Sequence, residues 1–463
     1  MAKRQTALAI DWILLTVFLS IILIGWLMLY TVSYVGPGFW FSFDSIVGRQ
    51  TIWMGISAVA FIAIYTLDWR IWNTLAYPVY FLTTFLLAAV LVFGQEINGA
   101  NSWFSVFGFS FQPSEIAKFG TALALSAYLS QGTVKMDSLK DILLSFTLFT
   151  VPAGLIILQP DPGTALVFMA FTVPLFRAGL NASLYLLGIS LAFTLIGSLL
   201  WSPFILLLII LLVGYYILIS NSKEKRIPFS VLALLTLFLV SSFSYVSYSI
   251  LLTITIIAGI YFYFLVYKRG KYKILYTTAI ISVLYTILAF GTKWSFENIL
   301  KPHHQDRINV WLKPELTDPK GALYNIIQSK TAIGSGGLTG KGFLDGNMTK
   351  LNYVPEQSTD FIFSILGEEQ GFLGSISLVL LFTLMLFRIS IIAERSTLPF
   401  IRYYAYSIAG IIFIHFFINI GMTVGLMPVI GIPLPLMSKG GSSLLSFTIM
   451  IAALLKMDQS RVR

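Results

Sequence analysis

The sequence predicts an all-α polytopic membrane protein with about fourteen transmembrane helices. Hydrophobic residues make up 57% of its 463 residues and charged residues only 11%, against about 25% charged residues in an average soluble protein. The apolar residues gather in stretches of roughly 20, the length that a helix needs to cross a bilayer. Lipid must therefore solvate much of the surface of this protein.

The first apolar stretch follows Lys3 and Arg4 and runs from about Ala9 to Tyr34. It is too long for a signal peptide and lacks a small-x-small cleavage site, so we interpret it as an uncleaved first span. Polar residues separate the later spans. The fourteen predicted spans lie near residues 12–34, 51–67, 74–94, 113–131, 142–159, 163–180, 183–200, 203–220, 229–246, 249–267, 274–291, 361–387, 403–426 and 433–456.

The distribution of Lys and Arg sets the predicted orientation, because short loops rich in positive charge stay on the cytoplasmic side. Fourteen spans that start inside place both termini in the cytoplasm. The short outer loops then contain Arg49 as their one basic residue, whereas the inner segments contain many. The same count places the long polar stretch at residues 292–360, before the third-last span, on the outer face.

The net charge of +10 does not indicate a nucleic-acid-binding protein, because in a membrane protein it reflects basic residues kept in cytoplasmic loops. The chain contains no Cys. Disulfides, thiolate metal sites and Cys nucleophiles are therefore excluded.

The outer stretch 292–360 is long enough to carry a function. Six glycines lie close together in it, which permits turns with positive φ and close approach of the backbone to a ligand. A flexible linker is the alternative interpretation. These glycines are Gly334, Gly336, Gly337, Gly340, Gly342 and Gly346.

Charged residues inside a membrane span are costly, so each one is a functional candidate. Glu115 and Lys118 lie three residues apart in the fourth predicted span and share one helix face, where they can form an ion pair. In the functional interpretation, Lys118 joins Arg307 or Lys330 of the outer stretch in holding the phosphates of a lipid head group. A purely structural ion pair is the alternative.

Two aspartates and a tryptophan lie near the same outer boundary. Asp161 occupies a tight turn and could simply cap the next helix. Asp360 opens the twelfth predicted span, where the helix dipole would keep it ionised, and a carboxylate at this depth can act as a general base toward a sugar hydroxyl. Trp103 could be either an interfacial belt residue or an anchor.

Five motifs follow one another in a fixed order along the chain. They are NGANSWFSVFGFSFQPSEIAK (98–118), QPDPGTA (159–165), YNIIQSKTAIGSGGLTGKGF (324–343), VPEQSTDFIFSILGEEQG (354–371) and NIGMTVGLMPVIGIPLPLMSKGGSS (419–443). Together they resemble the SEDS family of bacterial cell-wall proteins, which includes RodA, FtsW and SpoVE. The IIQSKTAIGSGG segment is more similar to RodA, the rod-shape-determining protein, than to FtsW.

The resemblance implies a peptidoglycan glycosyltransferase that polymerises lipid II at the outer face of the bacterial cytoplasmic membrane for cell elongation and shape. Asp360 matches the essential loop aspartate of the family, and Trp103 matches its NGA-x-x-W tryptophan. Three residues match its buried polar cluster: Glu115, Lys118 and Asp161. We further expect Arg307, Lys330, Glu356 and Thr359 to contact the substrate.

The chain departs from the family pattern in several places. Family members usually have ten spans, so about four extra spans are expected at residues 183–267, between core segments 1–182 and 268–463. Lys439 replaces a common Tyr, Pro162 a usual Leu and Asn101 a usual Arg. These changes concern details of the substrate more than the class of reaction.

The expected chemistry is an inverting glycosyl transfer, with a class B penicillin-binding protein and the elongation or division machinery as partners. No residue is predicted to hold a metal ion. A divalent cation, Mg²⁺ or Mn²⁺, at the pyrophosphate is the one cofactor considered. The alternatives are a lipid II flippase or other transporter, which would need a polar path across the bilayer, and a non-catalytic scaffold for the penicillin-binding protein.

Overall fold

The chain forms two compact units, which are described separately. Unit 1 comprises Met1–Asn181 and Asp318–Arg463, and unit 2 comprises Ala182–Thr317. The computed structural model describes residues 10–34, 42–97, 100–106, 109–220, 253, 257, 260, 272–300, 302–317 and 322–460. The predicted spans at 229–246 and 249–267 lie outside the described residues, apart from three isolated positions in the second of them.

The N-terminal half of unit 1 contains six of its main helices. These are α1 (Trp12–Ser33), α2 (Ile46–Thr66), α3 (Arg70–Thr74), α4 (Ala76–Phe93), α5 (Pro113–Leu129) and α6 (Leu139–Leu158). Asp11 and Ser45 cap α1 and α2 by accepting hydrogen bonds from backbone amides of the first turn. Helix α5 begins at Pro113, as the sequence indicated, and nearly all of its residues are buried.

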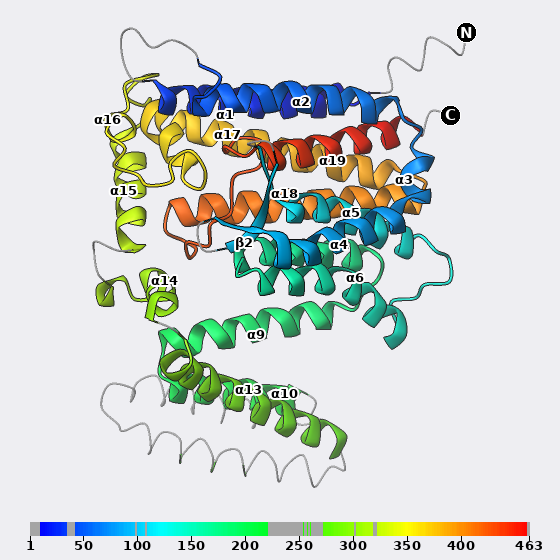
Figure 1. Ribbon diagram of the computed structural model, residues 1–463. Coiled ribbons are helices and arrows are strands. Elements are labelled where there is room, and N and C mark those ends of the chain that lie inside the picture. Colours follow the sequence, from blue (N-terminus) through cyan, green and yellow to red (C-terminus); the bar gives the residue numbers. More distant parts are fainter. Residues whose placement is uncertain are drawn as a thin grey trace. The chain divides into compact units, whose positions relative to one another are not determined.

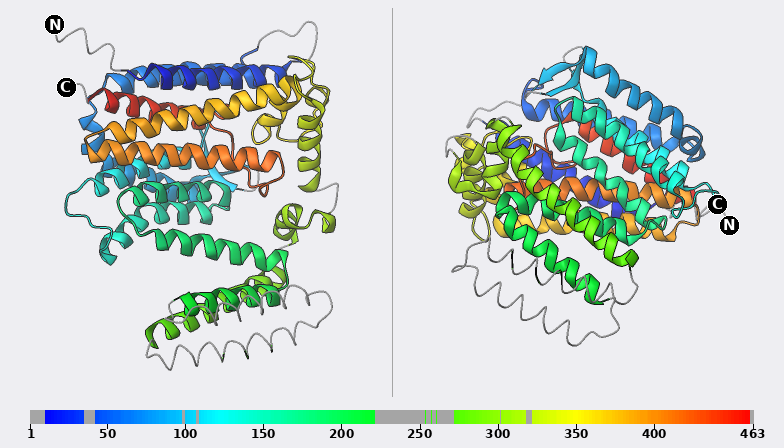
Figure 2. Two further views of the ribbon diagram at one scale, coloured as in Figure 1. Left: turned by 180° about the vertical axis from the view of Figure 1, so that it is seen from behind. Right: turned by 90° about the horizontal axis from the view of Figure 1, so that it is seen from below.

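The C-terminal half of unit 1 contains α15 (Ala322–Ser335), α16 (Asn347–Lys350), α17 (Ile362–Arg395), α18 (Pro399–Thr423) and α19 (Gly441–Gln459). Helices α1, α2, α17, α18 and α19 run side by side, and α15 crosses one end of this bundle (Figures 1 and 2). The bundle therefore brings the first and last helices of the chain together.

Unit 2 is helical. It contains α9 (Ala182–Leu200), α10 (Pro203–Ser220), α13 (Tyr272–Asn298), α14 (Pro302–Leu312) and the 3₁₀ helix η3 (Pro314–Leu316). Helix α13 packs against both α9 and α10. Part of the predicted outer stretch is therefore helical, because α13 extends to Asn298 and α14 follows it.

A small antiparallel sheet departs from the all-α prediction. Its strands are β1 (Gln95–Ile97), β2 (Ala100–Val106) and β3 (Phe109–Phe111), in the order β1-β2-β3. Gln95 pairs with Trp103, and Phe104 pairs with Phe111. Aromatic and β-branched residues favour extended structure, and this segment, expected to be a loop, is too short for another helical span.

Two predicted spans are not continuous helices. The span predicted at 163–180 is divided into α7 (Pro162–Val167), η2 (Phe168–Phe171) and α8 (Thr172–Arg177). The span predicted at 433–456 starts with a non-helical stretch, because α19 begins at Gly441. Pro433 and Pro435 lie in that stretch, and proline removes a backbone donor and breaks a helix interior.

By length and composition, nine helices among the described residues could cross a membrane. Shorter apolar helices accompany them at Pro162–Arg177 and Pro203–Tyr216. The protein is thus a helical polytopic membrane protein, but the predicted fourteen spans are not confirmed. The division into segments 1–182, 183–267 and 268–463 stays a prediction.

Four charged side chains join three helix ends in unit 1. Asp11, just before α1, accepts hydrogen bonds from Arg388 (2.7 Å) and Arg395 (3.0 Å) of α17. Arg395 also pairs with Asp458 of α19. Burial by itself would raise the pKa of the Asp11 carboxyl, but hydrogen bonds and charge from the two arginines hold it below its usual value.

The glycine-rich segment is packed against a kink in α17, so the flexible-linker interpretation does not fit it. Gly371 interrupts α17 with a φ of +61°. The amides of Lys341 and Gly342 donate to the carbonyls of Glu368 and Glu369, at 3.1 and 3.0 Å. A Cβ at Gly340 would lie 2.0 Å from the Glu369 carbonyl oxygen. This contact requires glycine.

Gly340→Ala is expected to lower the free energy of unfolding by roughly 2 kcal/mol or more, because the φ of +81° and the close carbonyl both disfavour a Cβ. Thermal unfolding of the purified protein in detergent measures the effect. Gly334→Ala is the matched control, since nothing lies within 4 Å of a Cβ built there. Equal unfolding temperatures for the two variants would contradict this packing argument.

Candidate functional site

Three successive backbone carbonyls hold Asp360 in place just before α17. Ser358, Thr359 and Asp360 accept hydrogen bonds from the Lys439 amide (2.8 Å), the Ser438 hydroxyl (2.5 Å) and the Asn419 side-chain amide (2.8 Å), respectively. All three donors come from the end of α18 or from the segment that follows it. The backbone at Asp360 is therefore held by a distant part of the chain.

The segment at residues 424–440 joins α18 to α19 without helical structure. Gly431, with a φ of +75°, lies against Asp360, and a Cβ built on it would be 3.5 Å from Oδ2 of that carboxyl. On its other side the segment meets the start of α7, where a Cβ at Gly163 would be 2.6 Å from the Ile430 carbonyl oxygen. The segment therefore lies between Asp360 and the helix start that carries Asp161.

Asp161 caps α7, which confirms the predicted cap. Its carboxylate accepts hydrogen bonds from the amide (3.0 Å) and the hydroxyl (2.7 Å) of Thr164. Gln112, the residue before α5, donates a third hydrogen bond at 3.1 Å. Capping is thus one role of Asp161, and the bond from Gln112 connects it to the helix that carries Glu115.

The carboxyl of Asp360 is half-buried. Burial, together with the nearby charges of Glu356 and Asp161, raises its pKa to about 6. The helix dipole, which was expected to keep Asp360 ionised, is therefore not the dominant influence on this pKa: Phe361 occupies the N-cap position, and burial and like charge raise the pKa. A pKa near the working pH suits a general base.

Glu115 and Lys118 form a fully buried ion pair at 2.9 Å. The Lys118 ammonium also bonds to Nε2 of His415 at 2.9 Å, and Nδ1 of His415 lies 3.1 Å from the Pro433 carbonyl oxygen. The second carboxylate oxygen of Glu115 is buried and has no hydrogen-bond partner among the described residues. This geometry favours the structural ion pair over a direct phosphate contact for Lys118, whose side chain is 0% exposed.

The other predicted site residues fall in different places. Trp103 is half-buried on β2. Glu356 and Thr359 belong to the turn before Asp360, where the Thr359 hydroxyl donates to the Glu356 carboxylate at 3.1 Å. Lys330 is exposed on α15, with its Nζ 3.7 Å from a Cβ built on Gly425. Arg307 lies on α14 in unit 2, and its side chain is outside the described part of the chain.

Sequence reasoning missed the acidic pair at the kink of α17. The Glu368 carboxylate accepts hydrogen bonds from the Lys341 ammonium (2.7 Å), the amides of Met348 (2.9 Å) and Thr349 (3.0 Å), and the Thr349 hydroxyl (2.8 Å). Glu369, also buried, accepts a bond from the Thr31 hydroxyl of α1 at 3.2 Å. Two consecutive glutamates in the sequence GEEQG, within an apolar span, were the signal that could have indicated this pair.

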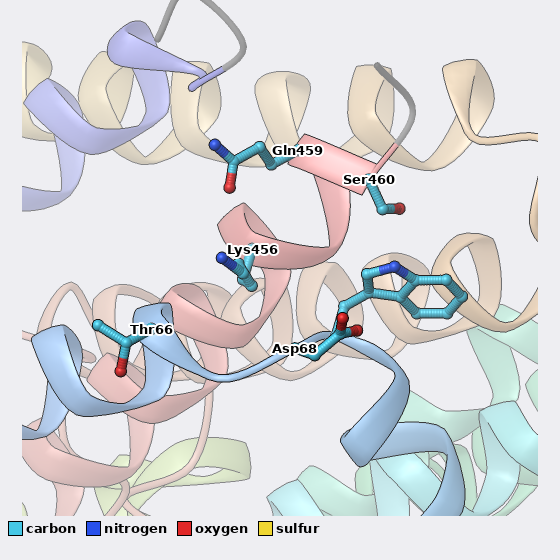
Figure 3. Close-up of a pocket in the computed structure, with 6 residues that line it drawn as sticks. Thr66, Asp68, Lys456, Gln459 and Ser460 are labelled. Atoms are coloured by element: carbon cyan, nitrogen blue, oxygen red, sulfur yellow. The ribbon is translucent and has the colours of Figure 1, made fainter. Parts of the chain in front are cut away.

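A pocket lies at the C-terminal end of α19 (Figure 3), and the opposite end of this helix lies near Asp360. It is lined by Thr66, Asp68, Trp69, Lys456, Gln459 and Ser460. Helix α19 begins beside Ser358 and ends at Gln459, about 28 Å away along the helix axis. No predicted site residue lines this pocket.

Glu368→Ala is expected to lower the free energy of unfolding by about 3 kcal/mol, because it removes the acceptor of four hydrogen bonds and leaves buried donors unpaired. Thermal unfolding and the rate of protease cleavage within residues 341–353 measure the loss. Lys350→Ala is the control, because its pair with Asp345 is exposed and should contribute less than about 1 kcal/mol. Comparable losses in both variants would argue against the anchoring role of Glu368.

Known proteins resemble this chain over nearly its whole length. The model of the family FtsW/RodA/SpoVE, described as cell cycle protein, matches residues 11–215 and 196–462. The peptidoglycan glycosyltransferase RodA of Treponema pallidum is 33% identical over 455 residues, which is 97% of this chain and 96% of the relative. The peptidoglycan glycosyltransferase MrdB of Escherichia coli K12 is 31% identical over 377 residues, 81% of this chain and 75% of the relative.

Two solved structures share the fold. One is a chain from a study of how a peptidoglycan synthase complex coordinates polymerization and crosslinking, with a TM-score of 0.63, 25% identity and coverage of 98% of this chain and 99% of that one. The rod shape determining protein RodA of Thermus thermophilus matches with a TM-score of 0.57, 24% identity and the same coverage.

Proposed function

Because the chain belongs to the FtsW, RodA and SpoVE family, we propose that Asp360 is the general base of a peptidoglycan glycosyltransferase that polymerises lipid II. The reaction and the substrate follow from membership of the family. The observation that supports the role of Asp360 is its half-buried carboxyl, held by three hydrogen bonds to consecutive backbone carbonyls beside a non-helical segment. Such a carboxyl is held in a fixed place, and its pKa of about 6 lies close to neutral pH.

The proposed step is an inverting displacement. Asp360 removes the proton from the 4-hydroxyl of the acceptor GlcNAc, and the oxygen attacks the anomeric carbon of the lipid-linked glycan. The bond from that carbon to the pyrophosphate oxygen breaks, and undecaprenyl pyrophosphate leaves. Glu356 and Thr359, in the turn just before Asp360, would orient the acceptor sugar, and Trp103 would contact the substrate from β2.

Two lysines are suited to the departing pyrophosphate. Lys330 on α15 and Lys439 at the end of the 424–440 segment are both exposed, and neither belongs to an ion pair among the described residues. Cationic groups that meet the developing negative charge stabilise the transition state. The proposal gives a structural role to Glu115, Lys118 and Asp161: they support the residues of the site and do not bind phosphate themselves.

The divalent cation expected at the pyrophosphate stays a proposal. Among the described residues, no three His, Asp or Glu side chains form a group that could hold a metal ion. No step of the proposed mechanism depends on such an ion.

The protein is a multi-pass membrane protein of the bacterial cell membrane. We place the termini in the cytoplasm and the Asp360 end of the bundle outside, because the basic residues of the short loops then lie inside. A class B penicillin-binding protein is the proposed partner, since a related chain comes from a peptidoglycan synthase complex. Elongation is the proposed cellular role, because RodA of Treponema pallidum is a relative.

Asp360→Asn and Asp360→Ala are expected to reduce lipid II polymerisation by at least about 100-fold, because neither side chain can accept the proton. Glycan chains made by the purified protein, alone and with its penicillin-binding partner, are separated on a gel and counted. Asp345→Asn is the control, because this carboxylate is exposed and pairs with Lys350 on the surface. Equal polymer from wild type and both Asp360 variants would favour the scaffold alternative, and no polymer from wild type would favour the flippase.

The rate of polymerisation should rise from pH 5 to pH 7 with a midpoint near 6, because the pKa of Asp360 is raised to about 6 and the base acts only when deprotonated. Glu356→Gln removes a nearby negative charge, which lowers the pKa of Asp360 and should move the midpoint to lower pH. Initial rates across this pH range test both statements. A midpoint that stays in place in Glu356→Gln, or moves upward, would refute the electrostatic assignment.

A further inference from the structure

Two residues one turn apart on α18 contact the segment that borders Asp360. His415 and Asn419 differ by four positions, so they lie on the same helix face. Both are buried, with 2% and 0% of their surfaces exposed. The catalytic step proposed above uses neither of them.

Asn419 holds two backbone segments together. Its side-chain nitrogen donates to the Asp360 carbonyl at 2.8 Å and to the Ile432 carbonyl at 2.7 Å. Both hydrogens of the amide are therefore used. Because Ile432 directly follows Gly431, the residue that borders the Asp360 carboxyl, this one side chain ties the backbone of the base to the segment beside it.

His415 holds the next residue of the same segment. A carbonyl oxygen can only accept, so the contact of Nδ1 with Pro433 at 3.1 Å requires the hydrogen on Nδ1. Nε2 then accepts from the Lys118 ammonium at 2.9 Å. The histidine thereby connects the buried ion pair on α5 to the residue that follows the Asn419 contact.

We infer that Asn419 and His415 are positioning residues that hold Asp360 and the segment Ile430–Pro433 in register for proton transfer. The inference rests on the proposed role of Asp360. A general base must lie within hydrogen-bonding distance of the hydroxyl that it deprotonates, and a displacement of about 1 Å can reduce the rate by roughly 100-fold. Helix α18 provides the rigid support from which both side chains act.

The test compares variants of the full-length protein with its penicillin-binding partner. Asn419→Leu keeps the approximate size and removes both donors, so kcat for polymerisation should fall by roughly 100-fold with little change in KM for lipid II. The acid limb of the pH profile should also move to lower pH, as Asp360 becomes more hydrated. Asn419→Gln, which keeps an amide donor, should recover part of the rate.

At position 415, two substitutions separate the two hydrogen bonds. His415→Asn keeps a donor near the position of Nδ1, and His415→Gln keeps an acceptor near the position of Nε2. If the contact with Pro433 is what matters, His415→Asn should retain more activity than His415→Gln. The reverse order would overturn the assignment of His415 as a residue that positions the segment.

Ser407→Ala is the matched control, because Ser407 is buried on the same helix and, among the described residues, its hydroxyl bonds only to the Tyr403 carbonyl of that helix, at 2.9 Å. Its kcat and pH profile should equal those of wild type.

If Asp360→Asn is inactive and Asn419→Leu has a wild-type kcat and pH profile, the positioning inference is wrong and the proposed function stands. Full activity in Asp360→Asn would instead overturn the proposed function. Should Asn419→Leu not fold, Asn419→Gln and the two His415 variants decide, and a rate that falls only with the folded fraction refutes the inference.

Discussion

The site depends on one constraint: a non-helical segment inside a membrane bundle must find partners for its backbone polar groups within the protein. Residues 424–440 meet this constraint through Asn419, His415, Ser438 and the Lys439 amide, which together satisfy carbonyls at 358–360 and at 432–433. The same hydrogen bonds that make the irregular backbone tolerable hold Asp360. The hydrogen bonds that satisfy the irregular backbone are therefore also the ones that build the site.

The carboxylates near the site divide into two kinds by the donors around them. Asp161 and Glu368 each accept several hydrogen bonds, which hold the two carboxylates in place and suit them to structural roles. Asp360 accepts one hydrogen bond at its backbone carbonyl, from Asn419, and its carboxyl is instead buried beside two like charges. Among the described residues, the donor that contacts Asp360 bonds to its main-chain carbonyl and not to its carboxylate, which leaves the carboxyl available for proton exchange.

The sequence predicted the features that depend on neighbouring residues. The first span ends within one residue of α1, and Asp161 caps a helix as its turn indicated. It could not predict contacts between distant residues: Lys118 meets His415 across 297 positions, and no local pattern marks that pair. It placed β2 in a loop, because cross-strand pairing rather than hydropathy makes that strand. The role of Asp360 was predicted from the resemblance of the motifs. The helix-dipole argument for its ionisation did not take the neighbouring carboxylates into account.

The charged cluster that joins Asp11 to α17 and α19 has a consequence for the order in which the protein is made. Asp11 precedes the first span to be synthesised, yet its partners Arg388 and Arg395 come some 380 residues later. Arg395 in turn shares its charge with Asp458, at the end of the last helix. While the chain is being made, the Asp11 carboxylate must therefore wait for Arg388 and Arg395, and the cluster can join α1, α17 and α19 only after all three helices have been synthesised.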